Sequence, residues 1–143
     1  MNAQKTDIIA RTVQKTELWI NHIAHSLHTD DERVAYHALR AVLHAVRDRL
    51  SIDDAASLGA QLPMLIRGLY YEGWHPHGKP LRIRDAEEFL ELVAQEVARQ
   101  AEQHLDPKRA VASVLAELDA QIDSGEIDKI RRSLPPPIRA LFE

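Results

Sequence analysis

Residues 61–74 read QLPMLIRGLYYEGW, and residues 133–142 read SLPPPIRALF. Both segments contain a Leu-Pro pair, two further residues, an Ile-Arg pair, one residue, and then Leu followed by an aromatic side chain. This recurrence indicates that one structural unit occurs twice in the chain. It predicts how the chain is built, and it does not name a reaction.

Apolar residues at spacings of three and four predict amphipathic helices through the first half of the chain. A helix from about residue 7 has one apolar stripe, with Trp19 beside it. A second helix follows residues 29–32, where Thr and Glu fit a capping box, and a third begins after Ser51. The residues expected to face the core are Ile9, Val13, Ile20, Ile23 and Leu27, then Ala35, Leu39, Val42, Leu43, Val46 and Leu50, then Ala55, Leu58 and Leu62.

The first Leu-Pro segment predicts a short fourth helix. Pro63 suits the first turn of a helix, where its missing N–H is no loss. Gly68 and Gly73 weaken this helix and help to end it. The Gly- and Pro-rich residues 73–80 then form the one clear loop.

The second half repeats this order of helices. A fifth helix is predicted from about Asp85, and a sixth has Asp106 as its N-cap and Pro107 in its first turn. Gly125 is expected to end the sixth helix in a left-handed conformation. The residues expected to face the core are Phe89, Leu92, Val93, Val97, Ala110, Val114, Leu118, Ile122, Ile127, Ile130 and Leu134.

The two halves, about residues 6–74 and about residues 84–143, align helix by helix, so that Trp19 matches Phe89. Neither half can cover its own apolar face, so we expect one shared core related by a pseudo-twofold axis. No segment shows the alternation of a strand bounded by turns. The sequence therefore predicts an all-α fold: a single domain over residues 1–143, folded as a compact bundle of about eight helices in two pseudo-symmetric four-helix halves.

The amino-acid composition argues against several classes of function. The 143 residues are 45% apolar and 28% charged, a soluble globular mixture, with a net charge of −4 and no cysteine. An acidic chain has no global attraction for nucleic acid or anionic lipid. The lack of cysteine excludes disulfides and thiolate chemistry. No apolar run suits a membrane span or a signal peptide, so a cytoplasmic location is expected.

Several of these motifs resemble a bacterial family known as domain of unknown function 2267. The matching segments are residues 38–44, 47–50, 58–74, 88–90, 125–127 and 134–142. The resemblance spans about residues 19–142. It implies an all-helical bacterial protein, and it carries no activity, cofactor or catalytic residue onto this chain.

The eight histidines suggest a metal site, but their placement favours solvated side chains. His22 and His25 share one face of the first helix, away from its apolar stripe. His37 and His44 are about 10 Å apart along a helix and are expected to point away from the core. No metal ligand or cofactor is assigned.

The clearest candidate for binding is the cluster around the first Leu-Pro segment. Its members are Arg67, Tyr70, Tyr71, Glu72, Trp74, His75 and His77. The second half has no counterpart to residues 71–77, and aromatic anchors of this kind dominate interface energetics. In the alternative interpretation, Trp74 and one Tyr simply fill the seam between the halves.

Arg67 and Arg139 occupy equivalent positions in the repeat, which favours a structural role over a pair of anion sites, because both copies keep it. The basic clusters are residues 82–84 and 129–132, and both have acidic neighbours. They are interpreted as solvated surfaces.

The sequence favours a helical protein-interaction or regulatory module that uses the Tyr70–His77 segment to bind an unidentified protein. No catalytic residue is assigned. The alternative is a small enzyme or small-molecule binder with a site between the halves, near Arg67, Glu72 and His75. Leftover apolar helix surface allows either a monomer or a homodimer.

Overall fold

A computed structural model describes residues 3–99 and 105–142, and the fold over these ranges is all-α. The helices are α1 (Ala3–Ser26), α2 (Glu32–Arg49), α3 (Ile52–Gln61), α4 (Met64–Tyr71), α5 (Ala86–Arg99), α6 (Pro107–Gln121), α7 (Ser124–Ser133) and α8 (Pro136–Arg139), followed by the 3₁₀ turn η1 (Ala140–Phe142). The described part of the chain contains no strand, as the periodicity predicted.

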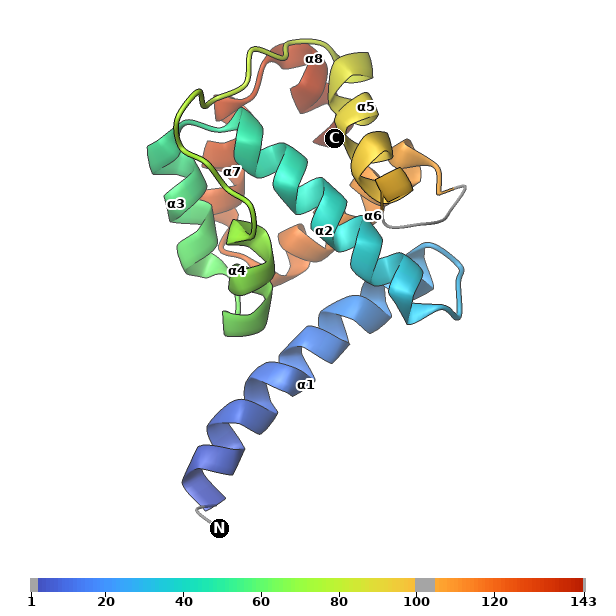
Figure 1. Cartoon of the computed structure of the whole chain (residues 1–143), viewed down its shortest axis with the longest axis vertical. Helices are drawn as coiled ribbons and strands as arrows, with labels where there is room; N and C mark the ends of the chain where they lie inside the picture. The colour runs from blue at the N-terminus through green and yellow to red at the C-terminus, as the bar shows by residue number, and fades with distance from the viewer. Residues whose placement is uncertain (1–2, 100–104, 143) are drawn as a thin grey trace.

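Helix α2 is the centre of the body (Figure 1), where it packs against α1, α4, α5 and α6. Its N-cap is Asp31, whose side chain accepts the Arg33 N–H. The predicted capping box at residues 29–32 is therefore wrong. Thr29 accepts the N–H of Asp31 instead, which forms a turn just before the helix.

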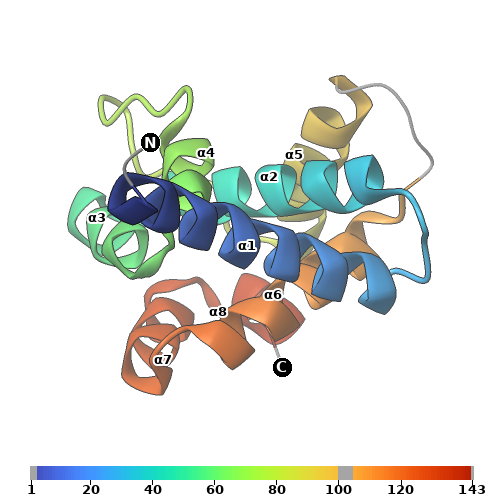
Figure 2. The same cartoon turned by 90° about the horizontal axis from the view of Figure 1, so that it is seen from below.

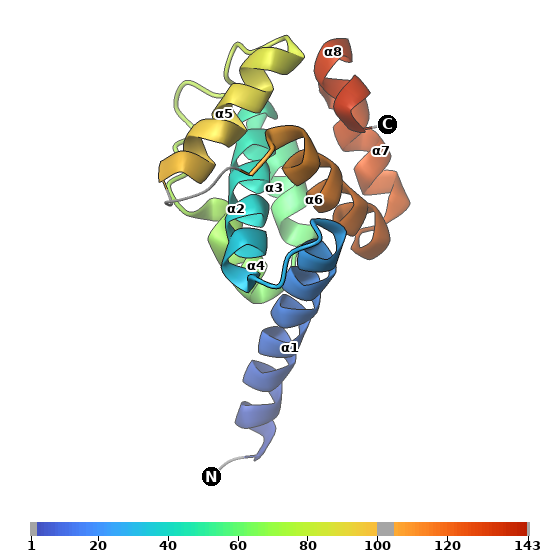
Figure 3. The same ribbon diagram turned by 90° about the vertical axis from the view of Figure 1, so that its right-hand side faces the viewer.

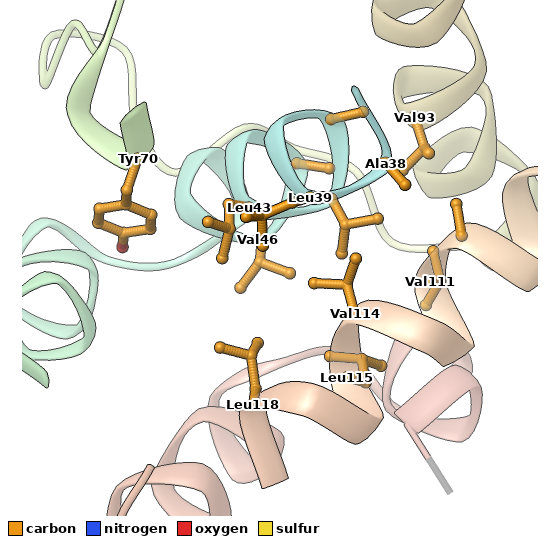
Figure 4. Packing of buried hydrophobic residues seen from close by; sticks show 14 of the residues in the cluster. Ala38, Leu39, Leu43, Val46, Tyr70, Val93, Val111, Val114, Leu115 and Leu118 are labelled. Carbon is orange, nitrogen blue, oxygen red and sulfur yellow. The ribbon is translucent and has the colours of Figure 1, made fainter. Parts of the chain in front are cut away.

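The core is one cluster that draws on every helix. Figure 4 shows its middle, where α2 faces α6 and side chains of α4 and α5 close the sides. The labelled residues are Ala38, Leu39, Leu43, Val46, Tyr70, Val93, Val111, Val114, Leu115 and Leu118. The predicted inward residues of the second to seventh helices are buried, except that Leu92 is half-buried at the margin.

Helix α1 is only partly covered by the body. Its C-terminal half crosses between α2 and α6 (Figure 2), whereas its N-terminal half projects beyond the body (Figures 1 and 3). Trp19, Ile20 and Ile23 are buried as predicted, but Ile9 is 58% and Val13 is 37% exposed. Their assignment to the core is wrong: α4 contacts this part of α1 at Thr12, which is buried, and leaves Ile9 and Val13 uncovered.

Two glycines behave differently from one another. Gly73 follows the end of α4 with a φ of +73°, a left-handed conformation that glycine adopts without strain. Gly125 was expected to end the sixth helix, but that helix ends at Gln121. Gly125 instead lies in the first turn of α7, where its N–H donates to the side chain of the N-cap residue, Asp123.

The helices pack in a recurring set of pairs. Helix α1 packs against α2, α4 and α6, and α5 packs against α6, α8 and α2. The short helices α3 and α7 pack against each other, and the Ser57 hydroxyl donates to a Glu126 carboxylate oxygen across this contact. Over the described residues, no helix is long and apolar enough to cross a membrane.

Candidate functional site

An apolar groove of about 360 Å³ lies where α1, α2 and α4 meet. We define the apolar groove by the residues that line it: Thr16, Ile20, Tyr36, Leu39, Leu65, Ile66, Gly68, Leu69 and Glu72. Leu65 and Tyr36 are among the most exposed large apolar side chains of the chain, at 46% and 40%. The groove therefore offers apolar surface to an incoming group.

The exposed half of α1 continues the wall of this groove. We call residues 3–15 the arm. Ile9 and Val13 precede Thr16 and Ile20 at helical spacing, so all four lie on one stripe. The polar stripe is equally regular, with Arg11 paired to Asp7 at 2.6 Å. The arm is thus an ordinary amphipathic helix whose apolar stripe faces solvent.

A polar clamp of His44 and Arg47 holds the C-terminal end of α4. One nitrogen of His44 is 2.8 Å from the carbonyl oxygen of Leu69. Arg47 is 3% exposed, and it donates to the carbonyls of Tyr70 and Glu72 at 2.7 and 2.8 Å. The Leu69 carbonyl also accepts the Glu72 N–H at 3.3 Å, and all three carbonyls lie at the C-terminal end of α4. The clamp therefore serves as a C-cap made by side chains.

An ionic network connects this clamp to α5. Glu96 accepts from Arg40 at 3.1 Å and lies 2.9 Å from the second ring nitrogen of His44. Burial alone would raise the pKa of Glu96, but the hydrogen bond with His44 and the charges of His44 and Arg40 outweigh burial and hold that pKa below its ordinary value. Arg40 also pairs with Glu72, and its hydrogen bond lowers the pKa of that exposed carboxyl.

The lowered pKa of Glu96 predicts acid destabilisation. A carboxyl whose pKa is lower in the folded state stabilises the fold above its unfolded pKa, near 4.5, and this stabilisation is lost as pH falls through the folded pKa. Glu96→Gln should therefore be less stable than wild type near neutral pH, and the difference should shrink as pH approaches about 3. Urea unfolding at a series of pH values measures this difference.

Glu91→Gln is the matched control, because Glu91 lies on the same helix with its side chain exposed. This control should follow the wild-type profile at every pH. A constant gap between wild type and Glu96→Gln across the acid range would contradict the prediction.

The aromatic side chains of the predicted cluster lie largely inside the protein. Tyr70 is fully buried, and its hydroxyl donates to the Ala55 carbonyl at 2.6 Å. Burial raises the pKa of Tyr70 well above its ordinary value. Tyr71 is half-buried, with its ring against Gly59, where an added Cβ would lie 2.3 Å from its hydroxyl. Trp74 is half-buried and packs against the core.

The remaining members of the cluster are spread over different surfaces. Glu72, His75 and His77 are exposed, and binding by these side chains stays a prediction. Arg67 and Glu72 line separate hollows: Glu72 lines the apolar groove, and Arg67 lines a hollow of about 390 Å³ beside Lys15. Because Arg67 and Glu72 line different hollows, the alternative small-molecule site around Arg67, Glu72 and His75 stays a prediction.

Arg67 and Arg139 make the same bonds. The Nε of Arg67 donates to the carbonyl eight residues before it, at 3.0 Å, and its Nη2 donates to the carbonyls seven and five residues before it. Arg139 bonds the carbonyls at the same three offsets. Each guanidinium caps the helix that precedes its own Leu-Pro pair, which matches the structural interpretation.

The histidines divide between surface and interior. His25 is exposed and His22 is mostly so, although His22 lies 2.9 Å from a carboxylate oxygen of the buried Glu117. The expectation that His44 points away from the core is wrong, because α4 covers it. The signal missed in the sequence is the spacing of Arg40, His44 and Arg47, which places three polar side chains along one side of α2. Among the described residues, no three His, Asp or Glu gather as metal ligands would.

Comparison with known proteins identifies a family. A family model described as "Uncharacterized conserved protein (DUF2267)" matches residues 16–141. The comparison with curated proteins gives no match. The matched range includes the apolar groove, the polar clamp and both Leu-Pro segments, and it begins after the exposed Ile9 and Val13 of the arm. Because the match covers most of its length, the chain belongs to the DUF2267 family.

Proposed function

We propose that the protein is a protein-interaction module that pairs with a second copy of itself through the arm and the apolar groove. The observation that carries this proposal is the continuous apolar stripe of α1. The stripe is buried at Ile20 and Ile23 and exposed at Ile9 and Val13, without a change of phase. The apolar stripe of this helix continues beyond the part that the body covers. Such a pattern is typical of a helix whose exposed part is covered by another chain.

The two exposed surfaces complement each other. The arm presents an uncovered apolar stripe at Ile9 and Val13, the apolar groove is a concave apolar surface, and both belong to one chain. A twofold dimer satisfies both at once, because each arm then lies against the groove of the other copy. A single pair of identical surfaces is also the simplest closed assembly, whereas a foreign partner would have to supply both complements.

The expected affinity is moderate. Covering a side chain that is about half exposed contributes about 1 kcal/mol, so Ile9 and Val13 of two copies contribute about 4 kcal/mol. Association itself costs about 4 kcal/mol or more, so the groove residues must supply most of the net binding. We therefore expect a reversible dimer whose population depends on concentration.

Sedimentation equilibrium over a range of concentrations tests this proposal. Wild type should fit a monomer–dimer equilibrium, and the double substitution Ile9→Gln/Val13→Gln should be monomeric at every concentration. Leu65→Gln, in the groove of the partner copy, should also weaken the dimer. These side chains are exposed, so each variant should keep its fold, and circular dichroism melting checks this.

The matched control removes equal apolar surface elsewhere. Leu18 faces away from the stripe on α1, and Ile52 begins α3; they are 47% and 45% exposed. Leu18→Gln/Ile52→Gln should dimerise like wild type. A monomeric wild type, or equal loss of dimer in the control variant, would overturn the proposal.

In this proposal the main role of the Tyr70–His77 segment is to hold α4 in place, and not to contact the partner. Tyr70 fixes α4 to α3, and the polar clamp fixes the end of α4, so that Leu65 and Leu69 form a rigid wall of the apolar groove. Rigid walls reduce the entropy lost on binding. The exposed Glu72 at the groove rim is the member of the segment that meets the second copy.

We also propose that the body arose as two copies of one four-helix unit. Exchanging α1 with α5, α2 with α6, α3 with α7, and α4 with α8 and η1 converts the α1–α6 contact into the α5–α2 contact, and leaves the α2–α6 and α3–α7 contacts unchanged. The identical bonds of Arg67 and Arg139 support the same exchange. The arm has no equivalent in α5, so it is an addition to the repeated unit.

A further inference from the structure

A basic pocket of about 690 Å³ lies under the chain that connects α4 to α5, far along the sequence from the arm. We define the basic pocket by its four cationic side chains, Arg49, Lys79, Arg82 and Arg84; Gly78, Pro80 and Leu81 complete its lining. Sequence alone separates Arg49 from the other three by thirty or more positions. The fold brings them together because the connector runs past the C-terminal end of α2 (Figure 1).

Two hydrogen bonds set the direction of the arginines. The N–H of Leu81 donates to the Asp48 carbonyl at 2.8 Å, and Arg49 Nε donates to the Ile83 carbonyl. The connector is therefore fixed at Leu81 and Ile83, both half-buried against the body. The connector is not helical here, and its side chains alternate between the body and solvent. Leu81 and Ile83 face the body, whereas Arg82 and Arg84 are exposed. The pocket is thus built by backbone anchoring and not by chance proximity of long side chains.

Within the described residues, the four cations of this pocket are not paired with carboxylates. The nearest acids along the chain are engaged: Asp48 pairs with Arg47, and Asp85 accepts the Glu88 N–H. Burial, and then the like charge of Arg84, lowers the pKa of Arg49. Four like charges around one hollow favour binding of an anion.

We propose that the basic pocket binds a small molecule that carries several phosphate groups. Guanidinium groups match phosphate oxygens in a two-point geometry, and three arginines with one lysine suit an anion of three or more charges. The volume lies within the range of small-ligand sites. The lining contains no aromatic side chain to stack a base, and the chain carries a net charge of −4, so a nucleic-acid strand is disfavoured.

Isothermal titration with sodium tripolyphosphate tests this proposal at about 0.15 M salt, where distant charges are screened. Wild type should bind one equivalent. Arg82→Gln/Arg84→Gln should bind about tenfold more weakly, or worse, for each arginine removed. Both side chains are exposed, so thermal melting of this variant should match wild type. Arg49→Gln should also weaken binding. Because this variant also loses the bond from Arg49 to the Ile83 carbonyl, its melting temperature shows whether the connector has been destabilised as well.

The control variant Lys108→Gln/Arg132→Gln removes the same net charge from exposed positions on α6 and α7. It should change affinity by less than about twofold at this ionic strength. No binding by wild type, or equal weakening in the control, would overturn the site. Equal binding of citrate would overturn the assignment to phosphate, and tight binding of a single-stranded oligonucleotide that depends on Arg82 and Arg84 would transfer the site to nucleic acid.

Discussion

Arg47→Met should lower the free energy of unfolding by about 3 kcal/mol, because it removes a buried cation and leaves its partners unpaired. The Arg47 side chain reaches the carbonyls of Tyr70 and Glu72 and the carboxylate of Asp48. Methionine keeps the apolar stem but donates no hydrogen bond, so the last carbonyls of α4 lose their donor. A carbonyl left without a partner in a buried place costs about 1–3 kcal/mol.

Urea unfolding at pH 7 measures this loss. Arg132→Met is the matched control: Arg132 is exposed on α7, and its replacement should change the stability by no more than about 0.5 kcal/mol. Arg47→Lys should fall between them, since lysine keeps the charge but lacks the planar fork that reaches two carbonyls at once. A stability loss below about 1 kcal/mol in Arg47→Met would contradict the capping role.

Phe89→Ala and Trp19→Ala should each cost about 3–5 kcal/mol, the range for a large aromatic side chain removed from a packed core. Phe89 is fully buried and Trp19 is 3% exposed. In the proposed duplication the two side chains occupy matching positions in α5 and α1, so losses of the same size are expected. Both variants should unfold at lower urea concentration with an unchanged slope, which denaturation curves measure directly.

Val13→Ala is the contrasting substitution on the same stripe of α1. Val13 is 37% exposed, so its truncation leaves no enclosed cavity and should cost far less than that of Trp19 in the monomer. A loss of less than about 1.5 kcal/mol at either Trp19 or Phe89 would count against equivalent roles for the two positions.

Much of the fold was readable from the sequence, because helical periodicity reports which residues share a face. The stripes of the helices from α2 to α7 carried this information, and their predicted residues are buried or packed at the margin. The same rule misassigned Ile9 and Val13. Periodicity gives the phase of an apolar stripe, but the length over which it is covered depends on where the other helices end.

The candidate sites were less predictable. Binding by the Tyr70–His77 segment stays a prediction, and Tyr70 itself is a core residue, because α3 and α2 close over it. His44 was expected at the surface, but it is buried because the end of α4 lies over it. Nothing in the sequence near His44 indicates this contact. The N-cap of α2 is Asp31 and not the predicted Thr29, because neighbouring Asp and Thr side chains compete for the same N–H groups.

Local spacing along the chain was enough to predict the all-α class, the order of the helices, the phase of each apolar stripe and the structural role of Arg67 and Arg139, since all of these depend on contacts between residues close together in sequence. Only the tertiary structure decided which apolar residues remain uncovered, how Arg40, His44 and Glu96 meet, and that Arg49 joins Arg82 and Arg84 around one pocket. These features depend on contacts between segments distant in the chain, which local spacing does not encode.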